Sequence, residues 1–251
     1  MDPELEPLRE RVALACRVLA GAGLAEHVLG HVSARVDGTR LLVRCRGPVE
    51  RGLAHTTGQD VHLVDLAGHG AAEGWAVPNE LPIHSEILRA RPDVTAVVHC
   101  HPPAVVAASV AGLPWLPLVG AYDIPAARLA ADGIPVWPRS VLVRRRDLAA
   151  DLLAAMGTRP VVVLRGHGLV SVGSDRSDPA RAVAAAVVQS VAVESLARMM
   201  LAVAGTGASL VAVPDEDLAE LPDLGAGFNV STMWRHLCAR IGPDAADPTT
   251  R

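Results

Sequence analysis

Apolar positions recur at two different spacings in the first third of the chain, and each spacing predicts a different element. Between residues 4 and 22 they recur every three or four positions, which predicts an opening helix. Residues 31–45 alternate apolar and polar about a glycine turn, which predicts a β-hairpin, and residues 60–74 predict a further strand and turn. A small antiparallel sheet is therefore expected near the N-terminus.

Predicted helices and predicted strands alternate through the rest of the chain. The pattern predicts, in order, a helix at 82–90, a strand at 94–101, a helix at 102–112, a loop at 113–125, a short extended segment at 133–138, a helix at 146–156, a strand at 160–168 and an alanine-rich helix at 178–204. This mixture predicts an α/β fold with a mainly antiparallel central sheet between helices, as one domain spanning residues 1–251.

The overall composition is that of a folded protein with a sizeable core, and it narrows the classes of partner. Half of the 251 residues are hydrophobic and a fifth are charged, and no run of apolar residues reaches the roughly 18 that predict a membrane span. A net charge of −4 with 2% aromatic residues offers little for binding nucleic acid. We expect neither a nucleic-acid nor a membrane partner, and the absence of a signal-peptide pattern favours the cytoplasm.

Lysine is absent from the sequence, so all 23 basic residues are arginine. Chemistry that needs a lysine Schiff base, including that of pyridoxal-phosphate enzymes, is therefore excluded. The cysteines form no CxxC pair and predict neither a zinc knuckle nor a disulfide framework. Gly-rich phosphate loops and the G-x-S-x-G hydrolase motif are missing as well. Electrophilic chemistry must then come from a metal, a non-lysine nucleophile or acid–base groups.

Two histidines one residue apart close the predicted strand at 94–101. Alternate residues of a strand share a face about 6 to 7 Å apart, so His99 and His101 suit one metal ion, although two solvent-facing histidines fit this pattern equally well. His167 follows a second apolar strand and lies between two glycines. Three imidazoles with an open fourth position are typical of a catalytic rather than a structural metal site.

Glu80 lies just before the predicted helix at 82–90, and His84 follows one turn later. A carboxylate there is a candidate metal ligand or general base. The competing interpretation is that Glu80 only stabilises the N-terminal end of the helix dipole, while His84 packs against the sheet.

Five motifs of this chain resemble those of the class II aldolase/adducin family: "GHVSAR" (30–35), "TTG" (56–58), "NE" (79–80), "IHSEILRARPDVTAVVHCHPP" (83–103) and "RGHGLV" (165–170). The resemblance covers roughly residues 8–205. In the family's sugar-phosphate aldolases a glutamate precedes the first strand histidine by nineteen positions, as Glu80 precedes His99 here.

The resemblance implies an α/β/α layered subunit, usually in a homotetramer, with a divalent cation held by His99, His101 and His167. It also implies that Glu80 is the catalytic acid–base group. Zinc is the first expectation for the cation, with manganese, cobalt or iron as alternatives.

In the family the active site lies between subunits, and the C-terminal segment of a neighbour reaches into it. Residues 222–251 are therefore expected to complete a neighbouring subunit's site. The candidates are Phe228, Trp234, Arg235 and His236, and packing within the interface is the expected role of most of them.

The family's phosphate-binding positions are only partly kept here. Pro78 and Asn79 stand where two serines are usual, and His31 replaces an asparagine. Proline offers neither an N–H nor a hydroxyl, so we expect a substrate without a phosphate group. The substrate-binding residues are expected to be His31, Ser33, Thr57, Gly58, Asn79 and Arg139.

Arginine is the only long cation available to bind a carboxylate. Besides Arg139, the candidates are Arg35 and the run of three arginines at 144–146, although a solvated helix start explains the run better.

Residues 120–143 resemble the branch of the family that decarboxylates hydroxylated aromatic acids such as dihydroxyphthalate. They include Tyr122, the only tyrosine, which is a candidate second proton donor opposite the metal. An amphipathic residue at the subunit interface is the alternative.

We therefore predict a divalent-metal-dependent carbon–carbon lyase that stabilises an enolate or carbanion, foremost a decarboxylase of a non-phosphorylated hydroxylated carboxylic acid. One alternative is a class II aldolase or epimerase acting on a sugar-like or aldehyde-derived substrate. Others are a non-haem iron oxygenase that uses Glu80 with two histidines, and an adducin-like binding module without catalysis. The expected partner is a small-molecule hydroxy acid or aldehyde.

Overall fold

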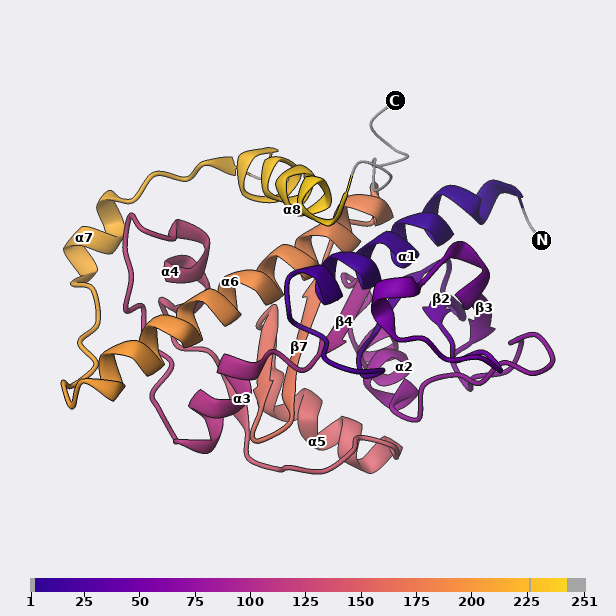
Figure 1. The fold of residues 1–251 in the computed structure, drawn as a ribbon, viewed down its shortest axis with the longest axis horizontal. Coiled ribbons are helices and arrows are strands. Elements are labelled where there is room, and N and C mark those ends of the chain that lie inside the picture. Colours follow the sequence, from indigo (N-terminus) through magenta and orange to yellow (C-terminus); the bar gives the residue numbers. More distant parts are fainter. Residues whose placement is uncertain (1–2, 226, 243–251) are drawn as a thin grey trace.

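Seven strands form one mixed sheet in the order β3-β2-β1-β4-β7-β6-β5 in the computed structural model, which describes residues 3–225 and 227–242 (Figure 1). Neighbouring strands are antiparallel except β5 and β6, which are parallel. The strands are β1 (His31–Arg35), β2 (Arg40–Arg44), β3 (Val61–Asp65), β4 (Ala96–Cys100), β5 (Val136–Trp137), β6 (Val161–Leu164) and β7 (Gly168–Gly173). The predicted α/β class with a mainly antiparallel central sheet is confirmed.

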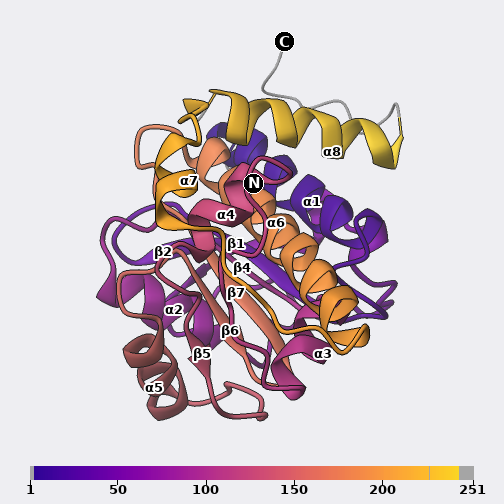
Figure 2. The same cartoon turned by 90° about the vertical axis from the view of Figure 1, so that its left-hand side faces the viewer.

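Helices cover both faces of this sheet (Figure 2). One apolar core joins the sheet to α1 (Glu6–Gly21), α3 (Pro103–Val110), α4 (Ile124–Ala130), α6 (Pro179–Gly205) and α8 (Met233–Ile241). The core on the opposite face is shared with α2 (Leu81–Ala90) and α5 (Arg146–Met156). The remaining elements are α7 (Asp215–Glu220), the 3-10 turns η1 (Pro3–Leu5), η2 (Leu53–His55) and η3 (Gly58–Asp60), and a π-helical turn, η4 (Gly227–Thr232).

The alternation of side chains along β4 decides which residues face which core. Ala96 and Val98 lie in the core with α1 and α6, whereas Val97 lies in the core with α2 and α5. His99 is two residues after Val97, so its side chain emerges on the α2 side of the sheet. Every residue of β4 is buried, as expected for a strand covered on both faces.

Several elements were not predicted from the sequence, among them β7, α4, α7 and α8. The strand β7 follows the predicted strand at 160–168 directly, because β6 turns back on itself within Arg165–His167 and pairs antiparallel with β7. Helix α4 begins inside the predicted loop at 113–125, where the side chain of Asp123 accepts a hydrogen bond from the Ala126 N–H and caps the helix. The predicted single domain over 1–251 includes residues 1–2, 226 and 243–251, which lie outside the described residues.

Helix α6 is long and apolar enough to cross a membrane by length and composition alone. However, 56% of its most apolar window is buried within the protein, and the helix packs on the sheet and on α1 and α3. Its apolar character is therefore that of a core helix.

The close approach of α6 to β7 depends on a glycine. A Cβ atom on Gly173 would lie 1.9 Å from the backbone oxygen of Ala182 in α6, so the helix would have to move. We predict that Gly173→Ala lowers the free energy of unfolding by about 1–3 kcal/mol or more, as measured by chemical denaturation. Gly205→Ala is the matched control, because nothing lies within 4 Å of a Cβ at that end of α6. Equal stability of the two variants would contradict this packing.

Candidate active site

The end of β4 holds the first histidine of the site in a fixed tautomer. His99 pairs with Val170 across β4 and β7, and its Nδ1 donates a hydrogen bond to the backbone oxygen of Leu169 at 2.9 Å. The neutral ring then carries its lone pair on Nε2, on the α2 side of the sheet. A backbone acceptor on the far nitrogen is the usual way in which proteins orient a metal-binding histidine.

Two further histidines bring their rings to the same point. The ring centroids of His99, His101 and His167 lie 4.8 to 4.9 Å apart, in edge-to-face pairs. The Nε2 atoms of His101 and His99 are 2.9 Å apart. His167 lies on the tight turn between β6 and β7, after Gly166 with a φ of +63°. Both of its ring nitrogens are buried without a hydrogen-bond partner in the described part of the chain.

Glu80 completes this cluster from the N-terminal end of α2. Its Oε1 accepts a hydrogen bond from the Val143 N–H at 2.8 Å, which orients the carboxylate. Its Oε2 lies 3.4 Å from His99 Nε2 and 3.6 Å from His167 Nε2. One ligand atom from each of Glu80, His99, His101 and His167 thus lies within 4.8 Å of the others. Glu80 is the N-cap residue of α2 but its side chain makes no capping hydrogen bond, and the carboxylate points to the histidines instead.

Burial favours the neutral form of His101, which is the form that binds metals. Burial, followed by the proximity of His99 and His167, lowers the pKa of His101 to about 3. Burial raises the pKa of the Glu80 carboxyl, but the imidazoles of His167 and His99 lower it by more, so the net pKa lies below its ordinary value. The ionised form of Glu80 is therefore favoured.

A hydrogen-bonded row of side chains runs along the wall of the cluster. His31 Nδ1 lies 2.7 Å from His84 Nε2, and His84 Nδ1 lies 2.6 Å from Ser33 Oγ. Burial, then the nearby His99, lowers the pKa of His84 to about 3, so its ring is neutral. Ser33 is completely buried behind His31. Ser33 therefore contacts His84 and, through it, supports His31, while its predicted contact with substrate stays a prediction.

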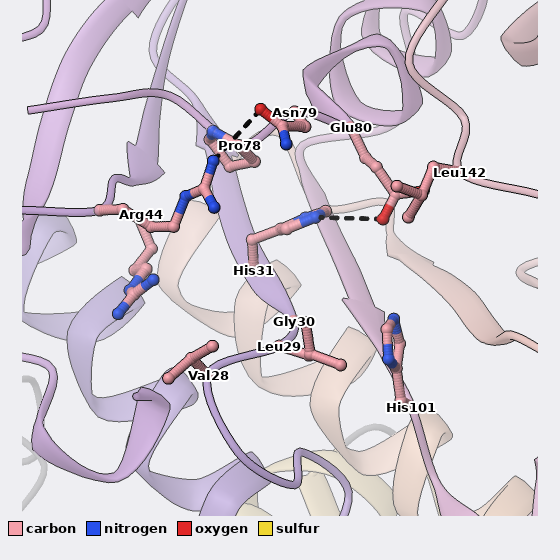
Figure 3. A pocket seen from close by; sticks show the side chains of 11 residues that line it. Val28, Leu29, Gly30, His31, Arg44, Pro78, Asn79, Glu80, His101 and Leu142 are labelled. Atoms are coloured by element: carbon pink, nitrogen blue, oxygen red, sulfur yellow. Dashed lines mark hydrogen bonds and ion pairs between the residues drawn. The ribbon is translucent and has the colours of Figure 1, made fainter. Parts of the chain in front are cut away.

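A cavity of about 130 Å³ opens beside the cluster. Figure 3 shows His31 between Arg44 on one side and Glu80 on the other, with His101 near the Glu80 end. Val28, Leu29 and Leu142 provide apolar surface. The remaining lining residues are Gly30, Arg46, Pro78 and Asn79.

Sequence reasoning missed the two arginines of this cavity. Arg44 is the last residue of β2, and Arg46 lies two residues beyond it, where it forms an isolated bridge with Ala76. The hairpin was predicted, but its pattern did not indicate that these arginines would line a cavity with His31.

Several predicted substrate-binding residues lie elsewhere. Thr57 and Gly58 begin η3 beneath α1, where a Cβ on Gly58 would meet the Glu10 side chain, and neither lines the cavity. Arg139 lies over the ring of Trp137, 5.9 Å from its centroid, and is likewise not part of the lining. Of the predicted substrate-binding residues, His31 and Asn79 line this chain's own cavity and these three do not, and their contacts with substrate stay predictions.

The other carboxylate-binding candidates are occupied by structural contacts. Arg35 donates to the backbone oxygens of Leu88, Arg91 and Val94. In the run 144–146, Arg145 pairs with Asp147 and Arg146 pairs with Glu86 at the exposed start of α5, as the solvated helix start predicts.

The candidate second proton donor lies on the surface, as do most of the candidate residues in the C-terminal segment. Tyr122 is 73% exposed and does not line the cavity of its own chain. Phe228, Arg235 and His236 are exposed. Trp234 is buried in its own chain with the Arg11 guanidinium 5.0 Å over its ring, and its expected contact with a neighbour stays a prediction.

The donor set of the cluster fits a divalent cation. It offers three neutral imidazoles and one carboxylate, and the unpartnered nitrogens of His167 would be costly in a buried site without a cation to bind. The assignment of the three histidines as ligands stays a prediction that this geometry supports.

Known proteins resemble this chain along almost its whole length. Residues 10–201 match the family described as "Class II Aldolase and Adducin N-terminal domain". The 3,4-dihydroxyphthalate decarboxylase of Arthrobacter keyseri is 58% identical over 238 residues, which are 93% of each chain. The 3,4-dihydroxyphthalate decarboxylase of Rhodococcus jostii (strain RHA1) is 47% identical over 244 residues, 95% of this chain and 98% of that protein.

A solved structure extends the comparison to the fold. The aldolase II superfamily protein from Pseudomonas syringae has a TM-score of 0.76 at 24% identity, covering 96% of this chain and 94% of that one. At this level of identity the likeness concerns the fold alone. Together with the family match and the two relatives, it shows that this chain belongs to the class II aldolase and adducin family.

Proposed function

We propose that this protein is a divalent-metal-dependent decarboxylase of a hydroxylated aromatic acid, and that 3,4-dihydroxyphthalate is its substrate. The observation that carries the proposal is the 47–58% identity to three curated 3,4-dihydroxyphthalate decarboxylases over 93–95% of the chain. The cluster of Glu80 with three histidines gives that likeness a chemical basis.

The cavity beside the cluster suits one substituted aromatic ring. Its volume of about 130 Å³ is close to the roughly 150 Å³ of a cavity known to hold benzene. Pro78 has no N–H to donate to a phosphate, while Val28, Leu29 and Leu142 offer apolar contacts to a ring. These features favour a planar hydroxy acid over a sugar phosphate.

The cofactor in this proposal is a divalent ion held by His99, His101 and His167, with zinc first and manganese, cobalt or iron as alternatives. When bound, such an ion supplies positive charge that stabilises the negative charge developing on a substrate oxygen. The neutral imidazoles leave that charge undiminished.

Glu80 has the properties of a group that moves one proton. In the net reaction the carbon–carboxylate bond breaks, its electron pair stays with the ring, and a proton takes the place of CO₂ on that carbon. Because Glu80 starts ionised, it can first accept a proton from a substrate hydroxyl and then deliver the same proton to the ring carbon. The Val143 N–H holds the other carboxylate oxygen in place throughout.

His31 stands where it can orient the substrate. It is 8% exposed, lines the cavity, and is fixed from behind by His84 and Ser33. Its Nε2 lies 3.9 Å from Glu80 Oε2, so a substrate hydroxyl in reach of Glu80 is also close to this ring.

Aldol cleavage is the second candidate function. A 5-methylthioribulose-1-phosphate/5-deoxyribulose-1-phosphate aldolase from Rhodospirillum rubrum is 29% identical over 76% of this chain, and the same cluster could serve its chemistry. An oxygenase that uses Glu80 with His99 and His167 is distinguished by a requirement for oxygen.

We also propose a cytoplasmic homotetramer with the active site at the subunit interface. Val28, Leu29 and Leu142 line the cavity yet are 45%, 47% and 50% exposed, which supports a covering subunit there. All four cysteines are free and buried, in keeping with a reducing compartment. Of the proposed partner segment 222–251, residues 226 and 243–251 lie outside the described residues.

Metal content tests the proposed cofactor. We expect the purified protein to hold or take up about one divalent ion per chain by plasma mass spectrometry. His101→Ala should lose most of it, because one of three imidazole ligands is gone. His69→Ala, on an exposed turn, is the matched control and should keep the metal. A wild-type protein that binds no cation, or a His101→Ala variant that binds it fully, would overturn the assignment.

Product analysis tests the reaction. With metal supplied, 3,4-dihydroxyphthalate should give one CO₂ and one dihydroxybenzoate per molecule consumed. Glu80→Gln should lower kcat by about 10²- to 10⁴-fold, because the group that transfers the proton is removed. Glu86→Gln, on the same helix α2, should leave it unchanged. Release of an aldehyde without CO₂ would favour the aldolase, and dependence on oxygen would favour the oxygenase.

The mass in solution tests the assembly. Light scattering coupled to gel filtration should give about four times the 26.1 kDa chain mass. Leu29→Arg places a charge on the exposed apolar rim of the cavity and should lower both the mass and the activity. A fully active monomer would rule out a shared active site.

A further inference from the structure

Two arginines line the cavity away from the cluster of Glu80 and the three histidines, and only one of them forms an ion pair with a described residue. Arg44 is 4% exposed and forms an ion pair with Glu50, whose Oε1 also accepts a hydrogen bond from the Gly52 N–H. That guanidinium already has its counter-ion. It therefore serves as a structural neighbour rather than as a site for an incoming anion.

Arg46 has no such counter-ion. Within residues 3–225 and 227–242 it takes part in no ion pair, and its side chain makes one hydrogen bond, from Nη2 to Asn79 Oδ1 at 3.2 Å. Its Nε is buried and has no acceptor. The guanidinium therefore keeps terminal N–H groups that can donate charge-assisted hydrogen bonds to a carboxylate in the cavity that it lines.

The position of Arg46 relative to the cluster is fixed by two sets of contacts. Its backbone pairs with Ala76 in both directions, at 2.8 and 2.9 Å. Its side chain is bonded to Asn79, the residue that precedes Glu80. The basic end and the acid–base carboxylate are therefore held on two sides of one short cavity, with His31 between them (Figure 3).

We propose that Arg46 is a specificity-determining residue that binds the carboxylate the substrate retains. This inference rests on the proposed decarboxylase function and defines its substrate class as aromatic 1,2-dicarboxylates with two adjacent hydroxyls. A ring whose 3- and 4-hydroxyls face the cluster places carbon 1 on its opposite edge, toward Arg46. Carbon 2 then lies beside the 3-hydroxyl at the cluster. The 2-carboxylate leaves as CO₂, and the product is 3,4-dihydroxybenzoate.

Paired substrates and variants test this assignment. The analogue 2,3-dihydroxybenzoate keeps the leaving carboxylate and both hydroxyls but lacks the carboxylate assigned to Arg46. In the wild-type protein kcat/KM for the diacid should exceed that for the analogue by about 10- to 100-fold, the range for one charged hydrogen-bonded pair. Arg46→Gln should remove this preference while leaving kcat/KM for the analogue within about threefold. Arg46→Lys, which has no planar fork, should fall between the two.

Product binding gives a second readout that does not depend on turnover. By calorimetry, Arg46→Gln should weaken binding of 3,4-dihydroxybenzoate by about 10-fold or more and leave binding of catechol unchanged. Arg40→Gln is the matched control, since Arg40 pairs with Asp37 at the exposed start of strand β2, whereas Arg46 lies just beyond the other end of that strand. It should behave as the wild type in both assays.

The outcomes separate the two proposals. If the wild-type protein releases no CO₂ from the diacid, the proposed function fails. If it does release CO₂ but Arg46→Gln lowers activity on both substrates equally, or on neither, the role of Arg46 is refuted while the decarboxylase stands. Retention of product affinity in a folded Arg46→Gln variant would refute that role as well.

Discussion

The convergence of three neutral imidazoles on one buried point is the constraint from which the rest of the site follows. His101 Nε2 and His99 Nε2 lie within hydrogen-bond distance of each other, but in the described part of the chain neither ring nitrogen of the buried His167 has a hydrogen-bond partner, which is unfavourable unless something else binds there. The pairing of β4 with β7 fixes this arrangement. The Leu169 carbonyl oxygen accepts a hydrogen bond from His99 Nδ1, and this hydrogen bond directs His99 Nε2 toward the cluster. A divalent cation is the partner that turns this cost into binding free energy.

The two ends of the cavity have different chemical properties, and on our account they interact with different groups of a diacid substrate. At one end, the ionised Glu80 lies among histidines that suit a cation, where negative charge can develop and a proton can be moved. At the other end, Arg46 is a cation that forms no ion pair with any described residue. His31 lies between them, supported from behind by buried polar side chains. On our account, this separation lets one carboxylate leave while the other anchors the ring.

The elements of the fold that are long or strongly patterned were predictable from the sequence, whereas the details that depend on register were not. Helices α1, α5 and α6 and the β1–β2 hairpin follow from apolar periodicity and turn residues. The strand β7 was missed because its partner β6 ends in a three-residue turn that holds His167, so two strands looked like one. Pro78 and Asn79 were recognised beside Glu80 because they adjoin it in sequence. Arg46 was not, since it reaches the cavity only through its bridge with Ala76. Similarly, Thr57 and Gly58 matched a short motif but lie beneath α1. Their position was not predictable, because a three-residue match carries no information about the path of the loop.

The direct test of the central claim is the coordination of the bound ion. X-ray absorption spectroscopy of the zinc-loaded protein should show three imidazole nitrogens at about 2.0–2.1 Å, together with one or more oxygen ligands. The spectrum of a His167→Gln variant should contain one imidazole fewer. A first shell that contains sulfur, or a wild-type spectrum with no imidazole scattering, would contradict the account.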